Sequence, residues 1–220
     1  MKRILKYLKV LLIIILLVFL YDRYLLLKRD IRIKRGENIV FLGDSLMARY
    51  DTNLYFRSFN VINSGIGGNM TQDILNDLEG RVFKYKPKKV FILVGTNDIV
   101  YSDLKLSEIK DNVNSIIESI KEYDRNIDIY LESIYPVIED LNEDIVYHRK
   151  NKTIIELNGY YKDLCSDKCT YINVFDSLKD KTGNLKRYYT KDGVHLNKIG
   201  YLKVSRILYK YMNFNNLTNI

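Results

Sequence analysis

The chain has 220 residues, 47% of them hydrophobic, which is enough for one folded domain with a single core and a short additional segment. Its net charge of +8 arises at the N-terminus, because residues 1–35 hold ten basic and two acidic residues and residues 36–220 hold 25 of each. A nucleic-acid-binding domain should have a basic face on its folded part, so this neutral balance argues against a nucleic-acid partner. Basic residues beside an apolar segment are instead typical of a membrane surface.

The apolar segment runs from Val10 to Tyr21 without a charge. A membrane span needs about 20 residues, and this length is reached if Tyr7 and Leu8 are included and the nearby lysines extend toward the headgroups. We therefore expect residues 1–27 to form an uncleaved signal anchor that crosses the cell membrane once, followed by a basic linker at residues 28–37. We expect the N-terminus in the cytoplasm and the rest of the chain outside it.

Two alternatives for this segment stay open. A cleaved signal peptide needs small residues at its cleavage site, and the only alanine of the chain is Ala48. A buried core helix is the other alternative. Basic residues both precede and follow the segment, so charge alone gives little information on orientation.

Beyond the linker, strand-like and helix-like patterns alternate. The apolar runs predict strands at residues 38–42, 58–63, 89–94, 127–133 and 171–175. Helical spacing predicts helices at residues 71–85, 107–123, 143–164 and 197–211, and residues 178–190 are loop-like. Thr71 is expected to cap the first of these helices. Such alternation implies a parallel sheet with helices on both faces.

Polar segments follow the predicted strands at the edge where ligands bind in such sheets. They are Gly43-Asp44-Ser45-Leu46, Asn63-Ser64-Gly65-Ile66-Gly67-Gly68, Gly95-Thr96-Asn97-Asp98 and Asp192-Gly193-Val194-His195-Leu196-Asn197. Ser45 supplies a hydroxyl nucleophile, His195 an imidazole that can take its proton, and Asp192 a carboxylate that can orient that imidazole. This set of side chains predicts acyl transfer through an acyl-serine intermediate.

In this order, the four segments resemble those of the GDSL/SGNH hydrolase family over residues 38–211. The resemblance implies an α/β fold, a flavodoxin-like three-layer α/β/α domain with a central parallel sheet of about five strands. Here an N-terminal anchor helix precedes this domain, and residues 212–220 follow it as a tail. Met47 occupies the last position of a Gly-x-Ser-x-Gly elbow, which disfavours a standard α/β-hydrolase.

The resemblance also assigns roles at the site. Ser45 would be the nucleophile, His195 the general base and Asp192 the carboxylate that orients it. The backbone N–H groups of Ser45 and Gly68 and the side-chain amide of Asn97 would bind the oxyanion. Position 69 is Asn where family members often have Asp, which leaves these donors in place. The mechanism requires no metal and no organic cofactor.

Other polar residues have a structural interpretation. Asp44 is expected to bind loop backbone, Asp98 to act as a cap or turn residue, and His148 to lie on the surface of a helix. Cys165 and Cys169 are expected to be free, although a small-loop disulfide stays open if the domain is exported.

The function predicted from these residues is a serine esterase that hydrolyses small acyl esters, acetyl first, on cell-envelope or extracellular carbohydrate. An O-acyltransferase on the same scaffold, a lysophospholipase or thioesterase acting on lipid substrates, and a non-catalytic binding module stay as alternatives. The sequence does not indicate the acyl-chain length or the oligomeric state.

Overall fold

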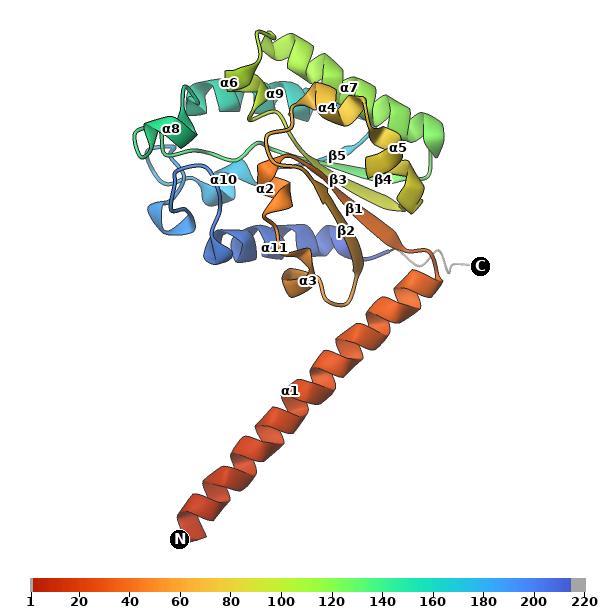
Figure 1. The fold of residues 1–220 in the computed structure, drawn as a ribbon, viewed down its shortest axis with the longest axis vertical. Helices are drawn as coiled ribbons and strands as arrows, with labels where there is room; N and C mark the ends of the chain where they lie inside the picture. Colours follow the sequence, from red (N-terminus) through yellow and green to blue (C-terminus); the bar gives the residue numbers. More distant parts are fainter. Residues whose placement is uncertain (1, 215–220) are drawn as a thin grey trace.

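A computed structural model describes residues 2–214 of the chain. Five parallel strands form one sheet in the order β2-β1-β3-β4-β5, with helices on both faces (Figure 1). The strands are β1 (Asn38–Gly43), β2 (Asn60–Gly65), β3 (Lys89–Leu93), β4 (Asp128–Glu132) and β5 (Thr170–Ile172). This strand order is that of flavodoxin-like folds, so the predicted fold class is confirmed.

The central strands are buried on both faces because helices cover both sides of the sheet. Every residue of β3 is buried, as are residues 39–43 of β1. Phe41 and Phe91 lie side by side across the β1–β3 pair, with ring centroids 4.9 Å apart. This apolar layer fixes the register of the two strands whose ends carry two of the polar segments.

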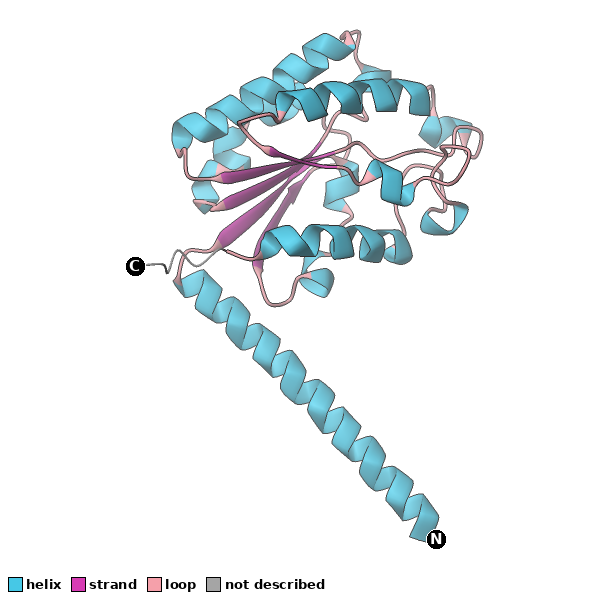
Figure 2. Cartoon of the chain, turned by 180° about the vertical axis from the view of Figure 1, so that it is seen from behind, coloured by secondary structure: helices cyan, strands magenta, loops and turns pink. Residues whose placement is uncertain are grey.

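The helices divide between the two faces of the sheet, as Figures 1 and 2 show from opposite sides. One face carries α4 (Thr71–Leu75), α5 (Leu78–Arg81), α7 (Leu106–Tyr123) and α9 (Asn151–Leu164). The other face carries α2 (Ser45–Ala48), α3 (Thr52–Tyr55) and α11 (Lys198–Met212). Shorter elements are η1 (Phe83–Tyr85), α6 (Asp98–Tyr101), α8 (Glu143–Val146), α10 (Phe175–Leu178) and η2 (Arg187–Tyr189).

Two helices that were predicted as continuous are interrupted. The segment 71–85 forms α4, α5 and η1, because the side chain of Asp77 accepts from the backbone N–H of Gly80 and starts a new helix there. The segment 143–164 breaks after α8, where Tyr147 has a left-handed φ of 52°. The predicted strand 171–175 is also shorter, since Phe175 already begins α10.

The cap predicted at Thr71 is wrong. Met70 precedes α4, and the backbone N–H of Thr71 donates to Asp98 at 2.9 Å. The hydroxyl of Thr71 donates to the same carboxylate. The hydroxyl that could have capped the helix is therefore hydrogen-bonded to Asp98, a residue distant in the sequence.

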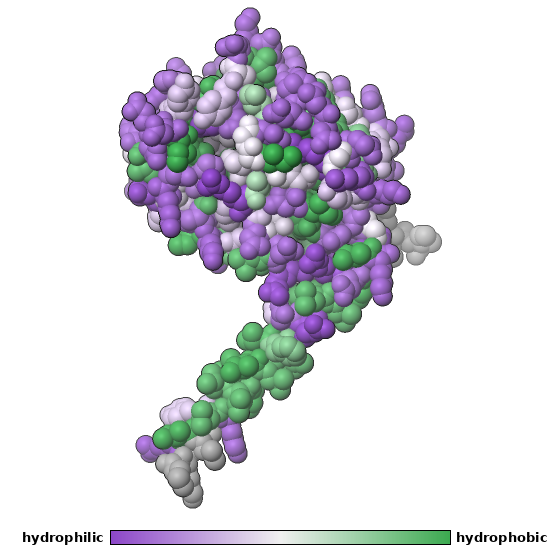
Figure 3. All heavy atoms as spheres, viewed as in Figure 1, coloured by the Kyte–Doolittle hydropathy of each residue, from purple (hydrophilic) through white to green (hydrophobic). Residues whose placement is uncertain are grey.

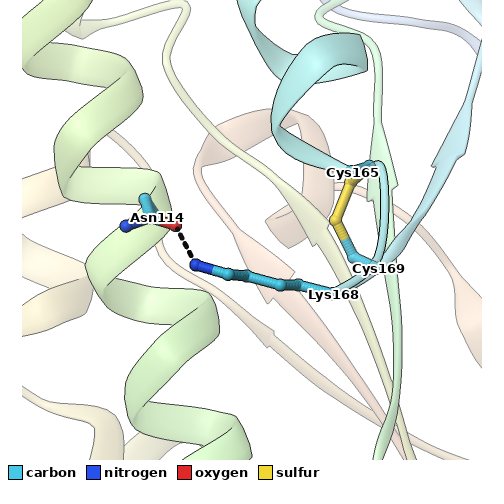
Figure 4. The surroundings of a disulfide bond; sticks show 4 residues. All are labelled: Asn114, Cys165, Lys168 and Cys169. Atoms are coloured by element: carbon cyan, nitrogen blue, oxygen red, sulfur yellow. Dashed lines mark hydrogen bonds between the residues drawn. A yellow bond between two sulfur atoms is a disulfide. The ribbon is translucent and has the colours of Figure 1, made fainter.

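The expectation of free cysteines is also wrong, because Cys165 and Cys169 form a disulfide (Figure 4). Helix α9 ends at Leu164, so the two residues lie in a turn rather than in a helix and their Cα atoms are 4.7 Å apart. Within the same turn, Lys168 reaches across to Asn114 and Glu118 of α7.

Helix α1 (Lys2–Lys34) leaves the domain as one straight element with apolar side chains on its surface (Figure 3). Residues 6–34 are long and apolar enough to cross a membrane, a property that a signal sequence shares. The helix continues through residues 28–34, which we had expected to be part of a linker. The domain contacts this helix at two places: Arg57 pairs with Asp22 at 2.6 Å, and Arg32, near the end of the helix, lies over the ring of Phe59. Of the predicted tail, residues 215–220 lie outside the described residues.

Candidate active site

Ser45 is held at the carboxyl end of β1 by the residues on either side of it. Asp44 begins the short helix α2, and its side chain accepts from the backbone N–H of Leu46 at 2.8 Å. Gly43 permits a close approach to β3, because a Cβ atom at this position would lie 2.2 Å from the carbonyl oxygen of Leu93. The tight packing behind Gly43 and the cap in front of it fix where the hydroxyl of Ser45 lies.

The hydroxyl, imidazole and carboxylate predicted from the sequence form one hydrogen-bonded chain. Ser45 Oγ lies 2.9 Å from His195 Nε2, and His195 Nδ1 lies 2.8 Å from Asp192 Oδ2. The Asp192 contact favours the tautomer with a proton on Nδ1, which leaves Nε2 free to accept the proton of Ser45. Residues 150 positions apart are thus brought within hydrogen-bonding distance.

The loop before α11 orients the carboxylate. Asp192 Oδ1 accepts from the backbone N–H groups of Val194 and His195, at 3.0 and 2.8 Å. Between them, Gly193 has a φ of 92°, and a Cβ atom there would lie 2.8 Å from a methyl group of Val146. A side chain at this position would therefore disturb the turn that holds the carboxylate against the imidazole.

The imidazole of His195 and the carboxyl of Asp192 both have lowered pKa values. Burial lowers the pKa of His195, Asp192 raises it, and the charges of Arg49 and Arg149 lower it, with a net decrease. Partial burial opposes ionisation of Asp192, but hydrogen bonds from Val194 and His195 outweigh burial and lower the pKa of this carboxyl. At neutral pH the site therefore holds a neutral imidazole beside an ionised carboxylate, as a general base requires.

Besides Ser45 itself, the predicted oxyanion donors Gly68 and Asn97 lie in the loops after β2 and β3. Gly68 has a φ of 80°, a conformation that favours glycine, in the loop after β2. A Cβ atom at the preceding Gly67 would lie 4.0 Å from the Cβ of Ser45, so this loop runs beside the nucleophile. Asn97 Nδ2 donates to the carbonyl oxygen of Asn69 at 2.9 Å, so the side-chain amide of Asn97 lies close to the residue that follows Gly68.

Arg149, a residue outside every sequence motif, orients this amide. Its Nη2 donates to Asn97 Oδ1 at 2.8 Å, and its Nε donates to the hydroxyl of Thr96 at 3.1 Å. The side chain is 3% exposed, and Nη1 binds the carbonyl oxygens of Ile145 and Val146 at the end of α8. Because Arg149 can only donate, the oxygen of Asn97 must face it and the NH₂ must face the loop at residue 69.

A second buried arginine ties together the loops around Ser45. Arg81 Nη2 donates to the carbonyl oxygens of Gly43 and Ser64 at 2.7 and 2.6 Å, and Nη1 donates to Asn69 Oδ1 at 2.6 Å. The asparagine at position 69 therefore accepts from Arg81 through its side chain and from Asn97 through its backbone. Neither arginine lies in a motif of the sequence, so nothing in the pattern pointed to them.

Of the three residues that were expected to be structural, Asp44 and Asp98 make buried hydrogen bonds. Asp98 is fully buried and accepts from Thr71. Asp44 is also fully buried, and burial raises its pKa to about 7. His148 is exposed, in the turn after α8 rather than in a helix. Among residues 2–214 we find no group of three or more His, Cys, Asp and Glu side chains arranged to hold a metal ion.

Comparison with known proteins shows the family. Residues 41–203 match the model of the GDSL-like Lipase/Acylhydrolase family. A solved structure from Streptococcus pneumonia, described provisionally as a platelet activating factor, is 32% identical with a TM-score of 0.76, covering 90% of this chain and 99% of that one. An acetyl xylan esterase, AlAXEase, shares the fold at 22% identity and a TM-score of 0.64, over 79% of this chain and 98% of that one.

A curated relative is longer than this chain. The N-acylneuraminate cytidylyltransferase of Escherichia coli O18:K1:H7 (strain RS218 / NMEC) is 32% identical over 186 residues. The match covers 82% of this chain and 42% of that protein. The family match covers most of the chain and includes all four polar segments, residues 43–46, 63–68, 95–98 and 192–197. The chain belongs to the GDSL-like lipase/acylhydrolase family and is a hydrolase that acts on ester bonds.

Proposed function

We propose that this protein is a membrane-tethered serine esterase that removes small acyl groups, acetyl first, from carbohydrate outside the cytoplasm. The observation that carries the chemistry is the continuous hydrogen-bonded chain from Asp192 through His195 to Ser45. Support for acetyl groups and carbohydrate comes from the acetyl xylan esterase that shares the fold.

In the proposed reaction, His195 Nε2 takes the proton of Ser45 as its Oγ attacks the ester carbonyl carbon. The N–H groups of Ser45 and Gly68 and the amide of Asn97 stabilise the oxyanion that forms. The imidazolium then gives its proton to the leaving alcohol, and Asp192 stabilises the positive charge. Water, deprotonated by His195, attacks the acyl-serine and releases the acid and Ser45.

The test compares the full-length protein in detergent with a Ser45→Ala variant. We expect hydrolysis of p-nitrophenyl acetate by the wild type and a loss of roughly 10⁴- to 10⁶-fold in kcat for the variant. We expect slower hydrolysis of p-nitrophenyl octanoate than of the acetate. Ser107→Ala, an exposed serine of α7, is the matched control and should keep full activity. Equal rates for the wild type and Ser45→Ala would contradict the proposal.

For the tether, we propose that α1 crosses the membrane with its N-terminus in the cytoplasm. Its apolar surface supports this placement, and the disulfide supports an oxidising compartment for the domain. A C-terminally tagged protein should remain in the membrane fraction at full length and be digested by protease added to intact cells. Digestion only after lysis would contradict the orientation, and a shortened soluble product would indicate a cleaved signal sequence.

A further inference from the structure

A cavity of about 620 Å³ opens beside the imidazole of His195. Its walls come from the end of α2, the loop that carries Asp192 and the first turns of α11. The lining includes His195 and Asp192 but none of Ser45, Gly68 and Asn97. The cavity therefore adjoins the base and its carboxylate, next to the nucleophile but not lined by it.

The charge of this lining is unbalanced. Arg49, Lys191 and Lys198 are exposed cations, whereas Asp192 is its single acidic residue. The carboxylate of Asp192 already bonds His195 at 2.8 Å, and Arg49 Nη1 lies 3.8 Å from it. Across residues 2–214, neither lysine lies within 4.0 Å of a carboxylate oxygen in an ion pair. Three positive charges thus line a cavity whose one carboxylate, that of Asp192, is already hydrogen-bonded to His195.

Another cavity of the domain shows that this imbalance is not a general property of its surface. That cavity, of about 780 Å³, lies at the end of α7, remote in the fold from Ser45. Its lining has three acidic and three basic residues: Glu118, Glu122, Asp124, Lys121, Arg125 and Lys168. Among these, Lys168 pairs with Glu118. The excess of positive charge is therefore not uniform over the surface, although a cavity at the end of α1 has one too, where Lys28, Arg32 and Arg35 line it with Glu37.

The positions of the reacting groups in ester cleavage determine which part of a substrate lies closest to this cavity. The leaving alcohol oxygen must come within hydrogen-bonding distance of His195 Nε2, because the imidazolium protonates it. The carbonyl oxygen must point the opposite way, toward Gly68 and Asn97. A large alcohol portion can therefore extend from Ser45 past His195 into this cavity.

We propose that this cavity binds an anionic group, a carboxylate or a phosphate, on a sugar that forms the alcohol portion of the ester. The inference rests on the proposed esterase function and specifies its substrate class. Arg49 can donate two parallel hydrogen bonds to such a group, and Lys191 and Lys198 add charge at the rim. A polar sugar ring suits a rim whose exposed side chains are mainly cationic.

An anion at this place would also assist the reaction. His195 becomes positively charged when it takes the proton of Ser45, and the charge of Arg49 opposes this change. A negative group bound by Arg49 offsets that repulsion during the step in which the imidazolium forms. The anion would therefore contribute to turnover as well as to binding.

The test uses the full-length protein in detergent and two matched pairs of acetyl esters. The first pair is O-acetylated glucuronic acid and its methyl ester, and the second is O-acetylated glucose 6-phosphate and O-acetylated glucose. We expect the anionic member of at least one pair to have about tenfold higher kcat/KM. The pair with the larger ratio identifies carboxylate or phosphate. The ratio should fall as salt is added, because these cations are exposed.

The variant Lys191→Gln/Lys198→Gln should lower this preference severalfold, because it removes both rim charges and leaves only Arg49. Lys162→Gln/Lys181→Gln removes the same charge from exposed positions elsewhere and should retain it. Equal kcat/KM within both pairs, while p-nitrophenyl acetate is still hydrolysed, overturns the anion site and leaves the esterase proposal intact. Absence of hydrolysis of every ester overturns the esterase proposal itself. A preference that both double variants lose equally also overturns the site.

Discussion

Two groups of residues near the site differ in exposure: Asn97 and Arg149 form a buried, hydrogen-bonded side, whereas Arg49, Lys191 and Lys198 form an exposed side along the cavity beside His195. The buried side offers donors in fixed positions, which suits a charge that develops in every ester cleavage. The exposed side offers mobile cations, which suits selection among alcohols. Substitutions on the buried side should therefore lower the turnover of all esters, whereas substitutions on the exposed side should change the selectivity between alcohols.

The largest effect should come from the buried side. Asn97→Ala removes one oxyanion donor, and we expect kcat for p-nitrophenyl acetate to fall by roughly 100- to 1000-fold. Asn53→Ala, an exposed position of α3, is the control. Steady-state kinetics of both variants measure the difference. A decrease of only about threefold, within the scatter of single surface mutations, would remove Asn97 from the oxyanion hole.

A smaller effect should follow from Arg149→Met, because this arginine acts through Asn97. We expect kcat to fall by roughly 10- to 100-fold with little change in KM, since the amide loses its fixed orientation. In Arg149→Met/Asn97→Ala, the loss should be no larger than in Asn97→Ala alone. Organophosphonate titration of Ser45 corrects for any misfolded fraction. Multiplicative losses would show that Arg149 acts independently of Asn97.

On the exposed side, Arg49→Gln should change the pH dependence. The base must be neutral, and burial together with Arg49 and Arg149 lowers the pKa of His195. Wild-type kcat/KM should therefore persist below the ordinary histidine pKa of about 6.5. Removing Arg49 should raise this pKa and move the acid limb to higher pH. Profiles of a neutral ester from about pH 4 to pH 8 test this, and an unmoved or lowered limb contradicts it.

The smallest effect on activity is expected far from both sides. Cys165→Ser/Cys169→Ser should lower the free energy of unfolding by about 2 kcal/mol, because the disulfide closes only a short loop. Activity toward p-nitrophenyl acetate should not change. Denaturant unfolding of the oxidised wild type and the double variant gives the comparison. A large loss of activity with an intact fold would connect this turn to the site.

Much of the architecture could be predicted because it depends on local patterns. Apolar runs marked the five strands, and the stripe from Ile109 to Ile120 marked the buried face of α7. The positions of Ser45, Asp192 and His195 followed from the motifs, since parallel strands end at one edge of the sheet. The loops that carry them could therefore be assigned to one site before the structure was known.

What could not be predicted depends on contacts between distant residues. Arg149 binds Asn97 across 52 positions, and a lone arginine in a charged segment has no periodic signal. The hydroxyl of Thr71 faces Asp98 instead of its own helix. The disulfide depended on where α9 ends, and element boundaries are the least certain part of a sequence pattern.

Helix α1 runs without a break from its apolar part to the ion pair of Arg32 with Glu37. The helix rises about 20 Å from Tyr21 to Lys34, and the domain lies along this part, since Arg57 pairs with Asp22. Anchored as proposed, the domain would be held close to the bilayer by a rigid helix instead of moving on a flexible linker. Its working zone is then a thin shell next to the lipid surface, so its esters must be made, or delivered, within that shell.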